Sequence, residues 1–197
     1  MKILIVGDKS RIIHLKHFSD KLKKFGVECK VITDTDFLEK SLSLNLKKKI
    51  NTNEKLKILL NDFEPNIVLL DKISKIGKIF LDEKIPLFLF LRGNYWEELE
   101  WAKKTIYKSP LKFFPVLKNQ KLADRIFKES SMILPISEYL KKEVEMRYSK
   151  NKIAVLKKTS IKNKTECIGF FDNITNNEEV IIIIDIIKNK KIVKISL

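Results

Sequence analysis

The chain has 197 residues, 44% of them hydrophobic and 9% aromatic, which is enough to bury one sizeable core and to begin a second. Cys29 and Cys167 lack CxxC spacing, which argues against a disulfide framework and a zinc site. No apolar run suits a signal peptide or a spanning helix. We therefore expect a soluble, cytoplasmic protein.

The net charge of +15 and the pI near 9.7 imply affinity for polyanions, and both nucleic acid and anionic lipid surfaces qualify. Nearly all of this positive charge comes from lysine, because the sequence contains only four arginines. A nucleic-acid reader usually relies on arginine for bidentate contacts to bases and phosphates. We interpret the excess of lysine mainly as solvent-exposed surface charge. Of the two polyanions, we regard nucleic acid as the less favoured partner.

Strands and helices alternate along the first half of the chain. Residues 2–6 form an apolar run typical of a buried strand, and residues 10–25 carry apolar side chains at helical spacing until Gly26 ends the helix. The next elements are a strand at 27–33, a mostly helical region at 37–63 with a break near 51–53, and a buried strand at 67–70.

The second half continues the alternation. We predict a helix at 74–83, a strand at 87–91, helices at 95–108 and 112–130, a strand at 132–136, a helix to 148 and a strand at 152–156. Uninterrupted apolar strands separated by helices are typical of a parallel sheet covered on both faces. The predicted class is therefore α/β, with a doubly wound, mainly parallel, Rossmann-like sheet.

The last forty residues are expected to begin a second α/β unit. After a polar linker at 159–165 the pattern predicts a strand at 166–171, a helix at 177–188 and a strand at 191–195. Two strands and one helix do not bury a core of their own. We therefore place a first domain at 1–157, and a linker with the incomplete start of a second domain at 158–197.

The stretch from 121 to 144, KLADRIFKESSMILPISEYLKKEV, joins a helix, a short buried strand and a further helix. Ser137 ends that strand and is expected to cap the next helix, while Glu138 faces the positive end of its dipole. In open α/β sheets the ligand crevice lies at the carboxyl ends of the strands. Ser137 and Glu138 are therefore candidate cleft residues.

Three blocks carry a resemblance to a known family: KILIVGDKSRIIHLKHFSDKLKKFGVECKVIT at the start, RGNYWEE after the fourth strand, and ADRIFKESSMILPISEYLKKEV. Together with the order of elements over residues 1–157, they resemble the N-terminal domain of retaining, family-four glycosyltransferases, which have the two-Rossmann GT-B fold. The resemblance implies an acceptor-binding half of a hexosyltransferase. It also implies a nucleotide-sugar co-substrate, a lipid-linked or saccharide acceptor, and metal-independent transfer without a cofactor.

The resemblance also suggests site residues, with departures from the family pattern. The loop after the first strand approaches the donor diphosphate in the family, and here it has one glycine; Gly7, Ser10 and Arg11 are the candidates, although Asp8 would oppose a phosphate. Many relatives place a histidine after the fourth strand, where this chain has Arg92, a cation suited to clamping a phosphate or carboxylate. Further acceptor-binding candidates are Asn94, Glu97 and Glu98.

No donor-binding half follows the first domain before Leu197, so we assign no catalytic residue and expect little activity from this chain alone. A separate donor-binding chain, a truncation and a non-catalytic binding module stay open. The basic and aromatic stretch at 101–121 suggests docking at an anionic inner membrane face. His14 and His17 are expected to face solvent, so no metal site is predicted.

The sequence argues against two other classes of protein. A phosphorylated receiver domain would use Asp8 and Asp71 after two of the strands, but the second acidic residue beside Asp8 is absent. A dinucleotide-dependent oxidoreductase would need GxGxxG after the first strand, and this chain has none there.

Overall fold

The computed structural model describes residues 1–37, 46–106 and 110–155, with side chains described except at 46–53 and 110–115. The predicted second unit, with its strands at 166–171 and 191–195 and its helix at 177–188, lies outside the described residues.

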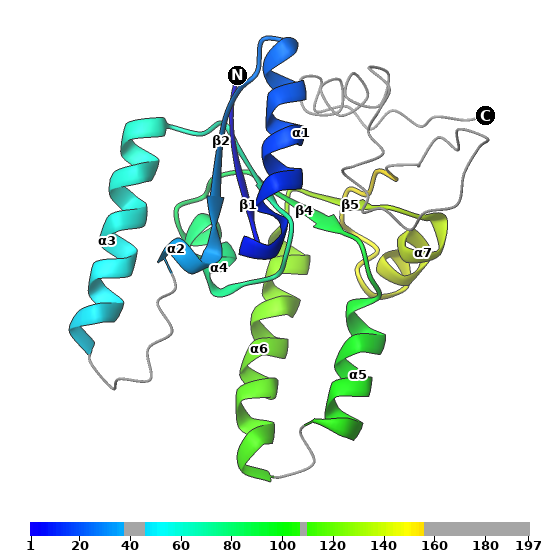
Figure 1. The fold of residues 1–197 in the computed structure, drawn as a ribbon. Helices are drawn as coiled ribbons and strands as arrows, with labels where there is room; N and C mark the ends of the chain where they lie inside the picture. Colours follow the sequence, from blue (N-terminus) through cyan, green and yellow to red (C-terminus); the bar gives the residue numbers. More distant parts are fainter. Residues whose placement is uncertain (38–45, 107–109, 156–197) are drawn as a thin grey trace.

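Five parallel strands form the centre of the molecule in the order β2-β1-β3-β4-β5 (Figure 1). The strands are β1 Lys2–Gly7, β2 Glu28–Thr33, β3 Ile67–Leu70, β4 Leu87–Leu91 and β5 Met132–Pro135. β1, β3, β4 and β5 are apolar runs, as strands buried on both faces need no polar alternation, whereas the edge strand β2 contains Glu28 and Lys30 and is buried only at its end. Every neighbouring pair is parallel, which confirms the predicted Rossmann-like α/β class.

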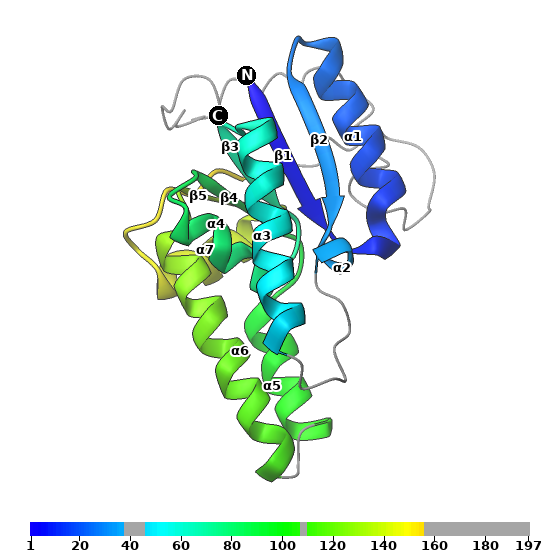
Figure 2. The same cartoon turned by 90° about the vertical axis from the view of Figure 1, so that its left-hand side faces the viewer.

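Helices connect and cover these strands. The short helix η1 Lys9–Arg11 leads into α1 Ile12–Lys24, and α2 Asp34–Phe37 follows β2. The remaining helices are α3 Leu46–Phe63, α4 Lys75–Asp82, α5 Tyr95–Thr105, α6 Pro110–Glu129 and α7 Glu138–Arg147. In both views α5 and α6 extend away from the sheet (Figures 1 and 2).

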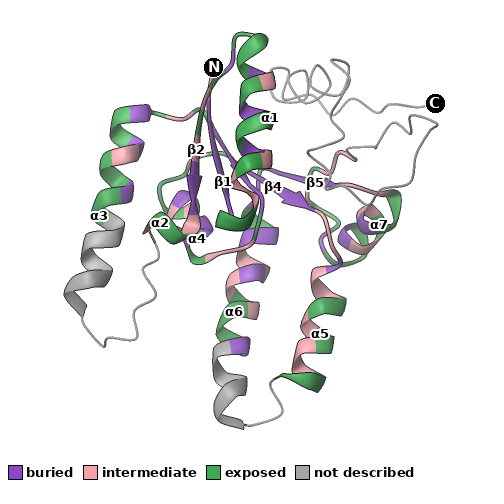
Figure 3. Cartoon of the chain, in the orientation of Figure 1, coloured by how far each residue is buried: buried purple, intermediate pink, exposed green. Residues whose placement is uncertain are grey.

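Two hydrophobic layers hold the sheet between helices, because successive residues of a strand point to opposite faces. On one face, α1 packs Leu15, Phe18 and Leu22 against Ile3 and Ile5 of β1. On the other face, buried residues of α3, α4, α6 and α7 pack against the alternate positions of the strands. Figure 2 shows β1 and β2 between α1 and α3, and Figure 3 shows the buried strands surrounded by helices with exposed outer faces.

Two predicted elements differ from the structure. The break predicted near 51–53 is wrong, because α3 runs without interruption from Leu46 to Phe63. Leu56, Leu60 and Phe63 are buried at helical spacing, and this packing outweighs the weak helix propensity of asparagine. The strand predicted at 152–156 is a single bridge between Ile133 and Ile153 within the described residues.

Helix ends follow the predicted signals. Gly26, at φ +73°, ends α1 in the left-handed region that glycine enters without steric cost. Ser137 caps α7 by accepting a 3.2 Å hydrogen bond from the amide of Leu140. In the part of the chain that the structure describes, no helix combines the length and apolar character needed to cross a membrane.

Candidate functional site

The strand order places a topological switch point between β1 and β3. The helix α1 connects β1 to β2 across one face of the sheet, and α3 connects β2 to β3 across the other face. The loops that follow β1 and β3 therefore diverge, and such a divergence is where open α/β sheets bind ligands. The residues at this point are Gly7 and Asp8 after β1, and Asp71 and Lys72 after β3.

Asp71 is the centre of the site. Its side chain is only 1% exposed, and its Oδ2 lies 2.5 Å from Nη2 of Arg92 and 4.0 Å from Nε of Arg11. Burial raises the pKa of the Asp71 carboxyl to about 7, while the Arg11 guanidinium acts in the opposite direction. This carboxylate thus ties together the loops that follow β1, β3 and β4.

A second ion pair crosses the switch point. Lys72 Nζ donates a 2.9 Å hydrogen bond to Asp8 Oδ2. The other oxygen, Asp8 Oδ1, accepts from the Ser10 amide at 2.9 Å and from the Ser10 hydroxyl at 2.8 Å. The hydrogen bond from Lys72, followed by those from Ser10, holds the pKa of Asp8 well below its ordinary range. Ser10 therefore donates to Asp8 and does not cap the helix by itself.

Gly7 is required here by close packing. A Cβ at this position would collide with Leu15 of α1 and would lie 3.3 Å from the Cβ of Asp71. The absence of a side chain lets β1 and α1 approach the buried carboxylate closely.

A hydrogen-bonded chain joins α5 to α7 at the carboxyl ends of β4 and β5. The Oδ1 of Asn94 caps α5 by accepting from the amides of Trp96 at 3.2 Å and Glu97 at 3.3 Å. Its Nδ2 donates a 2.8 Å bond to the hydroxyl of Tyr139, and that hydroxyl donates a 2.6 Å bond to Glu97 Oε1. The adjoining Glu138 lies 3.5 Å from Lys141.

A hollow of about 490 Å³ adjoins these residues between α4, α5 and α6. Its polar part contains Ser74, Lys75 and Glu98, and Glu98 lies so close to Gly93 that a Cβ there would come within 2.5 Å of Glu98 Oε1. Its apolar part runs between α5 and α6 and is lined by Tyr95, Leu99, Ala102, Val116 and Leu122. The hollow thus offers a polar end beside the carboxyl ends of the strands and an apolar body.

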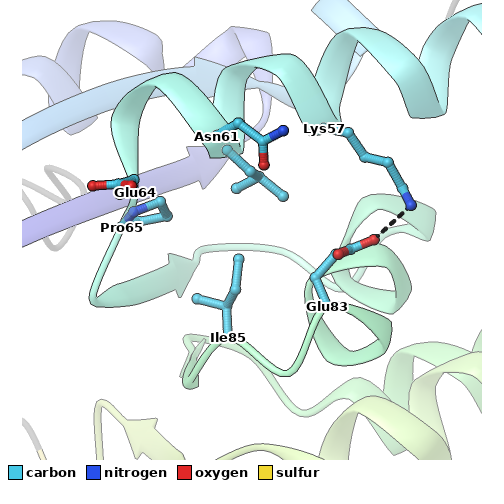
Figure 4. A pocket seen from close by; sticks show the side chains of 7 residues that line it. Lys57, Asn61, Glu64, Pro65, Glu83 and Ile85 are labelled. Atoms are coloured by element: carbon cyan, nitrogen blue, oxygen red, sulfur yellow. Dashed lines mark ion pairs between the residues drawn. The ribbon is translucent and has the colours of Figure 1, made fainter.

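Another hollow, of about 540 Å³, lies at the opposite, amino end of the strands between α3 and α4 (Figure 4). Lys57 and Glu83 form a 3.0 Å ion pair at its side, and Asn61, Glu64 and Ile85 also line it. Ligands of open α/β sheets bind at the carboxyl ends of the strands. Of the two hollows, we therefore take the one beside Glu98 as a candidate binding position, in addition to the switch point.

The structure divides the predicted site residues into neighbouring groups. Gly7, Ser10, Arg11 and Arg92 lie around Asp8 and Asp71, directly or through one contact. Asn94 and Glu97 share Tyr139, which follows Ser137 and Glu138 at the start of α7, whereas Glu98 lines the hollow.

Lys72 and Tyr139 were missed as site residues, and Asp71 was considered only for a receiver domain. Asp71 and Lys72 directly follow a buried strand, and this position is the signal that identifies them. The Asp71 side chain is only 1% exposed and is paired with two guanidinium groups, so it is poorly accessible to a phosphoryl donor. Among the described side chains, no group of three His, Cys, Asp or Glu is placed to hold a metal ion.

Comparison with solved structures finds similarity to UDP-GlcNAc 2-epimerases. The enzyme from Neisseria meningitidis bound to UDP-GlcNAc matches with a TM-score of 0.54 and 17% identity, over 79% of this chain and 46% of that one. The Methanocaldococcus jannaschii enzyme matches with a TM-score of 0.52 and 17% identity, over 79% of this chain and 45% of that one. The same enzyme in complex with UDP-GlcNAc and UDP gives a TM-score of 0.53.

No protein-family model matches the sequence, and no curated protein matches it. At this level of identity the likeness concerns the fold. The matched region spans less than half the length of these epimerases. The described part of the chain is a Rossmann-like unit of the kind found in GT-B-like enzymes.

Proposed function

We propose that this chain is the acceptor-binding half of a glycosyltransferase, which moves a hexose from a nucleotide-sugar to a lipid-linked or saccharide acceptor. A second Rossmann-like unit would supply the donor-binding wall, from residues beyond 157 or from a separate chain. The observation that carries the proposal is the hollow beside Glu98, which lies at the carboxyl ends of the strands. The fold around it resembles slightly less than half the length of UDP-GlcNAc 2-epimerases. Glycosyl transfer itself rests on the family resemblance of the sequence.

The lining of the hollow suits an acceptor with a polar head and an apolar body. Glu98 is a hydrogen-bond acceptor for a sugar hydroxyl, and Lys75 provides a positive charge for a phosphate on a lipid-linked acceptor. Leu99, Val116 and Leu122 would contact the apolar body, since burial of apolar surface supplies most of the affinity in such sites.

Arg92 takes a positioning role in this proposal. It is 15% exposed and bound to Asp71, so it holds the loop after β4 against the loop after β3. A loop fixed in this way presents Asn94 and Glu98 in a defined geometry, and it avoids the entropic cost of ordering them when the acceptor binds. We assign no general base. By analogy with the family, transfer retains the anomeric configuration, with the leaving diphosphate stabilised by basic groups and helix dipoles.

Transfer of labelled sugar from UDP-GlcNAc to the lipid and saccharide fractions of a cell extract tests the proposal. The purified chain is assayed alone and together with a candidate donor-binding Rossmann unit. We expect no turnover by the chain alone and transfer in the mixture. Glu98→Gln should reduce this transfer about tenfold or more if a hydroxyl is hydrogen-bonded there. Glu129→Gln is the matched control, because Glu129 lies at the far end of α6 and pairs with Arg125. Turnover by the chain alone would contradict the split assignment.

Epimerisation of a nucleotide-sugar is a second candidate, favoured by the names of the similar structures. The same mixture, incubated with UDP-GlcNAc and no acceptor, distinguishes the two reactions by proton NMR. Formation of the C2 epimer without sugar transfer would support epimerisation and contradict the proposed transfer.

A peripheral position at an anionic membrane forms part of the proposal for a lipid-linked acceptor. Along α5, the residue that follows it and α6, the side chains of Trp101, Ile106 and Leu117 are exposed, and so are those of Lys104, Lys118 and Lys121. Apolar side chains beside lysines suit an anionic lipid surface. Flotation with vesicles of phosphatidylglycerol should recover the chain, and vesicles of phosphatidylcholine should not. Trp101→Ser should weaken this binding. Equal recovery of variant and parent would remove α5 from the interface.

The alternative of a non-catalytic basic module predicts different behaviour. Such a module would bind nucleic acid or anionic vesicles with a steep dependence on salt and without any effect of Glu98→Gln.

A further inference from the structure

The basic side chains at the switch point differ in how exposed they are and in how firmly they are paired. Arg92 and Arg11 both face the carboxylate of Asp71, whose side chain is 1% exposed. A buried carboxylate cannot turn to solvent without leaving guanidinium charge uncompensated, so these contacts are costly to break. Lys72 is different, because its side chain is 57% exposed and its partner Asp8 is on the surface of the loop after β1.

The ion pair of Lys72 and Asp8 can open at low cost, so that another anion can take the place of Asp8. Exposed pairs contribute little to stability, because water solvates both groups when they separate. Asp8 has a second, separate task, since its Oδ1 accepts from the amide and hydroxyl of Ser10 and so forms the turn into η1. Lys72 contacts the other oxygen, Oδ2. One oxygen of Asp8 thus forms the turn with Ser10, and the other pairs with the Lys72 ammonium.

The ammonium group of Lys72 lies among carboxylates of three successive loops. Asp8, Asp34 and Asp71 all raise the pKa of Lys72, and the hydrogen bond that Lys72 donates to Asp8 is the largest contribution. These carboxylates follow β1, β2 and β3, so Lys72 lies at the carboxyl ends of three neighbouring strands. An anion that approaches this edge of the sheet meets in Lys72 a more exposed cation than Arg11 or Arg92, with Asp8 as its paired carboxylate.

We propose that Lys72 contacts the diphosphate of the nucleotide-sugar, and that Asp8 is an internal competitor whose carboxylate holds Lys72 until the ligand displaces it. This inference rests on the proposed function for the identity of the ligand, and it assigns to the chain a contact with the donor in addition to the acceptor. The ligand class is a diphosphate ester, which offers several charged oxygens to one ammonium group.

Asp8→Asn separates the two tasks of Asp8. The side-chain oxygen of asparagine still accepts from Ser10, so the turn is retained, whereas the charge that opposes an anion is removed. The dissociation constant of inorganic pyrophosphate is measured by calorimetry at low ionic strength. We expect Asp8→Asn to bind about 5-fold more tightly, and Lys72→Gln about 10-fold more weakly, than the parent.

A double variant shows whether Asp8 acts through Lys72. If it does, Asp8→Asn in the Lys72→Gln background gives little gain, because there is no longer an ammonium group to release. Asp20→Asn is the matched control, since it removes the same charge from an exposed pair with Lys23 on α1. A chain with net charge +15 binds polyanions non-specifically, so the difference between Asp8→Asn and Asp20→Asn is the decisive quantity.

Three results would overturn the inference: no pyrophosphate binding by the parent or by Asp8→Asn, equal gains for Asp8→Asn and Asp20→Asn, or an undiminished gain in the double variant. A parallel titration with UDP-GlcNAc tests the proposed function separately. The expected pyrophosphate results without UDP-GlcNAc binding would keep the anion site and reject the nucleotide-sugar. Lys72→Gln alters an exposed side chain and should leave thermal unfolding unchanged, which excludes a folding defect as the cause of weaker binding.

Discussion

The hydroxyl of Tyr139 donates a 2.6 Å hydrogen bond to Glu97 Oε1, which joins the first turn of α7 to the first turn of α5. The same hydroxyl accepts from Asn94, so one tyrosine holds the N-termini of two helices together at the carboxyl edge of the sheet. Asn94 therefore both caps α5 and anchors it to α7.

The two functions of Asn94 can be separated by substitution. Asn94→Ala removes both the cap and the bond to Tyr139, and should lower the free energy of unfolding by about 1–2 kcal/mol. Asn94→Asp keeps the capping oxygen and replaces the amide donor by a carboxylate oxygen, which the Tyr139 hydroxyl can donate to, so its loss should be smaller. Urea denaturation measures both, with Tyr139→Phe as the control that removes only the tyrosine hydroxyl. Equal losses for Asn94→Asp and Asn94→Ala would exclude a stabilising cap.

Gly7 and Gly26 should respond to alanine for different reasons. Gly7→Ala places a Cβ against Leu15 and Asp71, and such overpacking costs about 1–3 kcal/mol. Gly26→Ala meets open space but forces a left-handed backbone, at a cost of about 1 kcal/mol. Thermal unfolding compares the two. In addition, Gly7→Ala should shift the carboxyl resonance of Asp71 and Gly26→Ala should not. An unchanged Asp71 resonance in Gly7→Ala would contradict the close approach.

Stability should depend on the ionisation of Asp71. Burial raises its pKa from 3.8 to about 7, so the folded chain binds a proton between these values that the unfolded chain has released. The free energy of unfolding should therefore fall as pH rises from about 4 to 7. Asp71→Asn cannot ionise and should lose this part of the pH dependence. Urea denaturation at pH 5 and pH 7.5 provides the measurement. Parallel pH profiles for the variant and the parent would contradict the assignment to Asp71.

Lys84 follows α4 with a φ of +57°, a conformation that glycine adopts more readily than lysine. Lys84→Gly should raise the free energy of unfolding by about 0.5–1 kcal/mol. Lys78→Gly is the opposite control, because it places glycine inside the same helix and should cost about 1 kcal/mol. Chemical denaturation distinguishes the two signs. Destabilisation by Lys84→Gly would mean that its side chain stabilises the end of α4.

Most of the sheet could be predicted from the sequence because β1, β3, β4 and β5 are short apolar runs separated by turn residues. Ile67–Leu70 and Leu87–Leu91 are buried along their whole length, and a pattern without polar interruption is specific enough to identify them. The end of α1 at Gly26 and the cap at Ser137 were predictable for a similar reason, since each depends on one residue and its immediate neighbours.

The missed features depend on contacts between residues distant in sequence. The continuity of α3 follows from burial of Leu56 and Leu60 against the sheet, and local propensity carries no information about that burial. The pairing of Arg92 with Asp71 joins positions 21 residues apart, and the bond between Tyr139 and Glu97 joins positions 42 apart. The order of the strands decides which distant residues pair with a charged or hydroxyl side chain, and the local sequence does not reveal that order.

The aromatic packing around Trp96 gives the molecule an internal optical reporter. Trp96 stacks on Phe127 at 5.0 Å and lies 4.5 Å beneath the guanidinium of Arg147, whereas Trp101, one and a half turns further along α5, is 61% exposed. These are the two tryptophans of the chain, so its fluorescence combines a sheltered and a hydrated indole. With Trp101 replaced, the remaining emission reports on the seating of α5 against α6 and α7 alone.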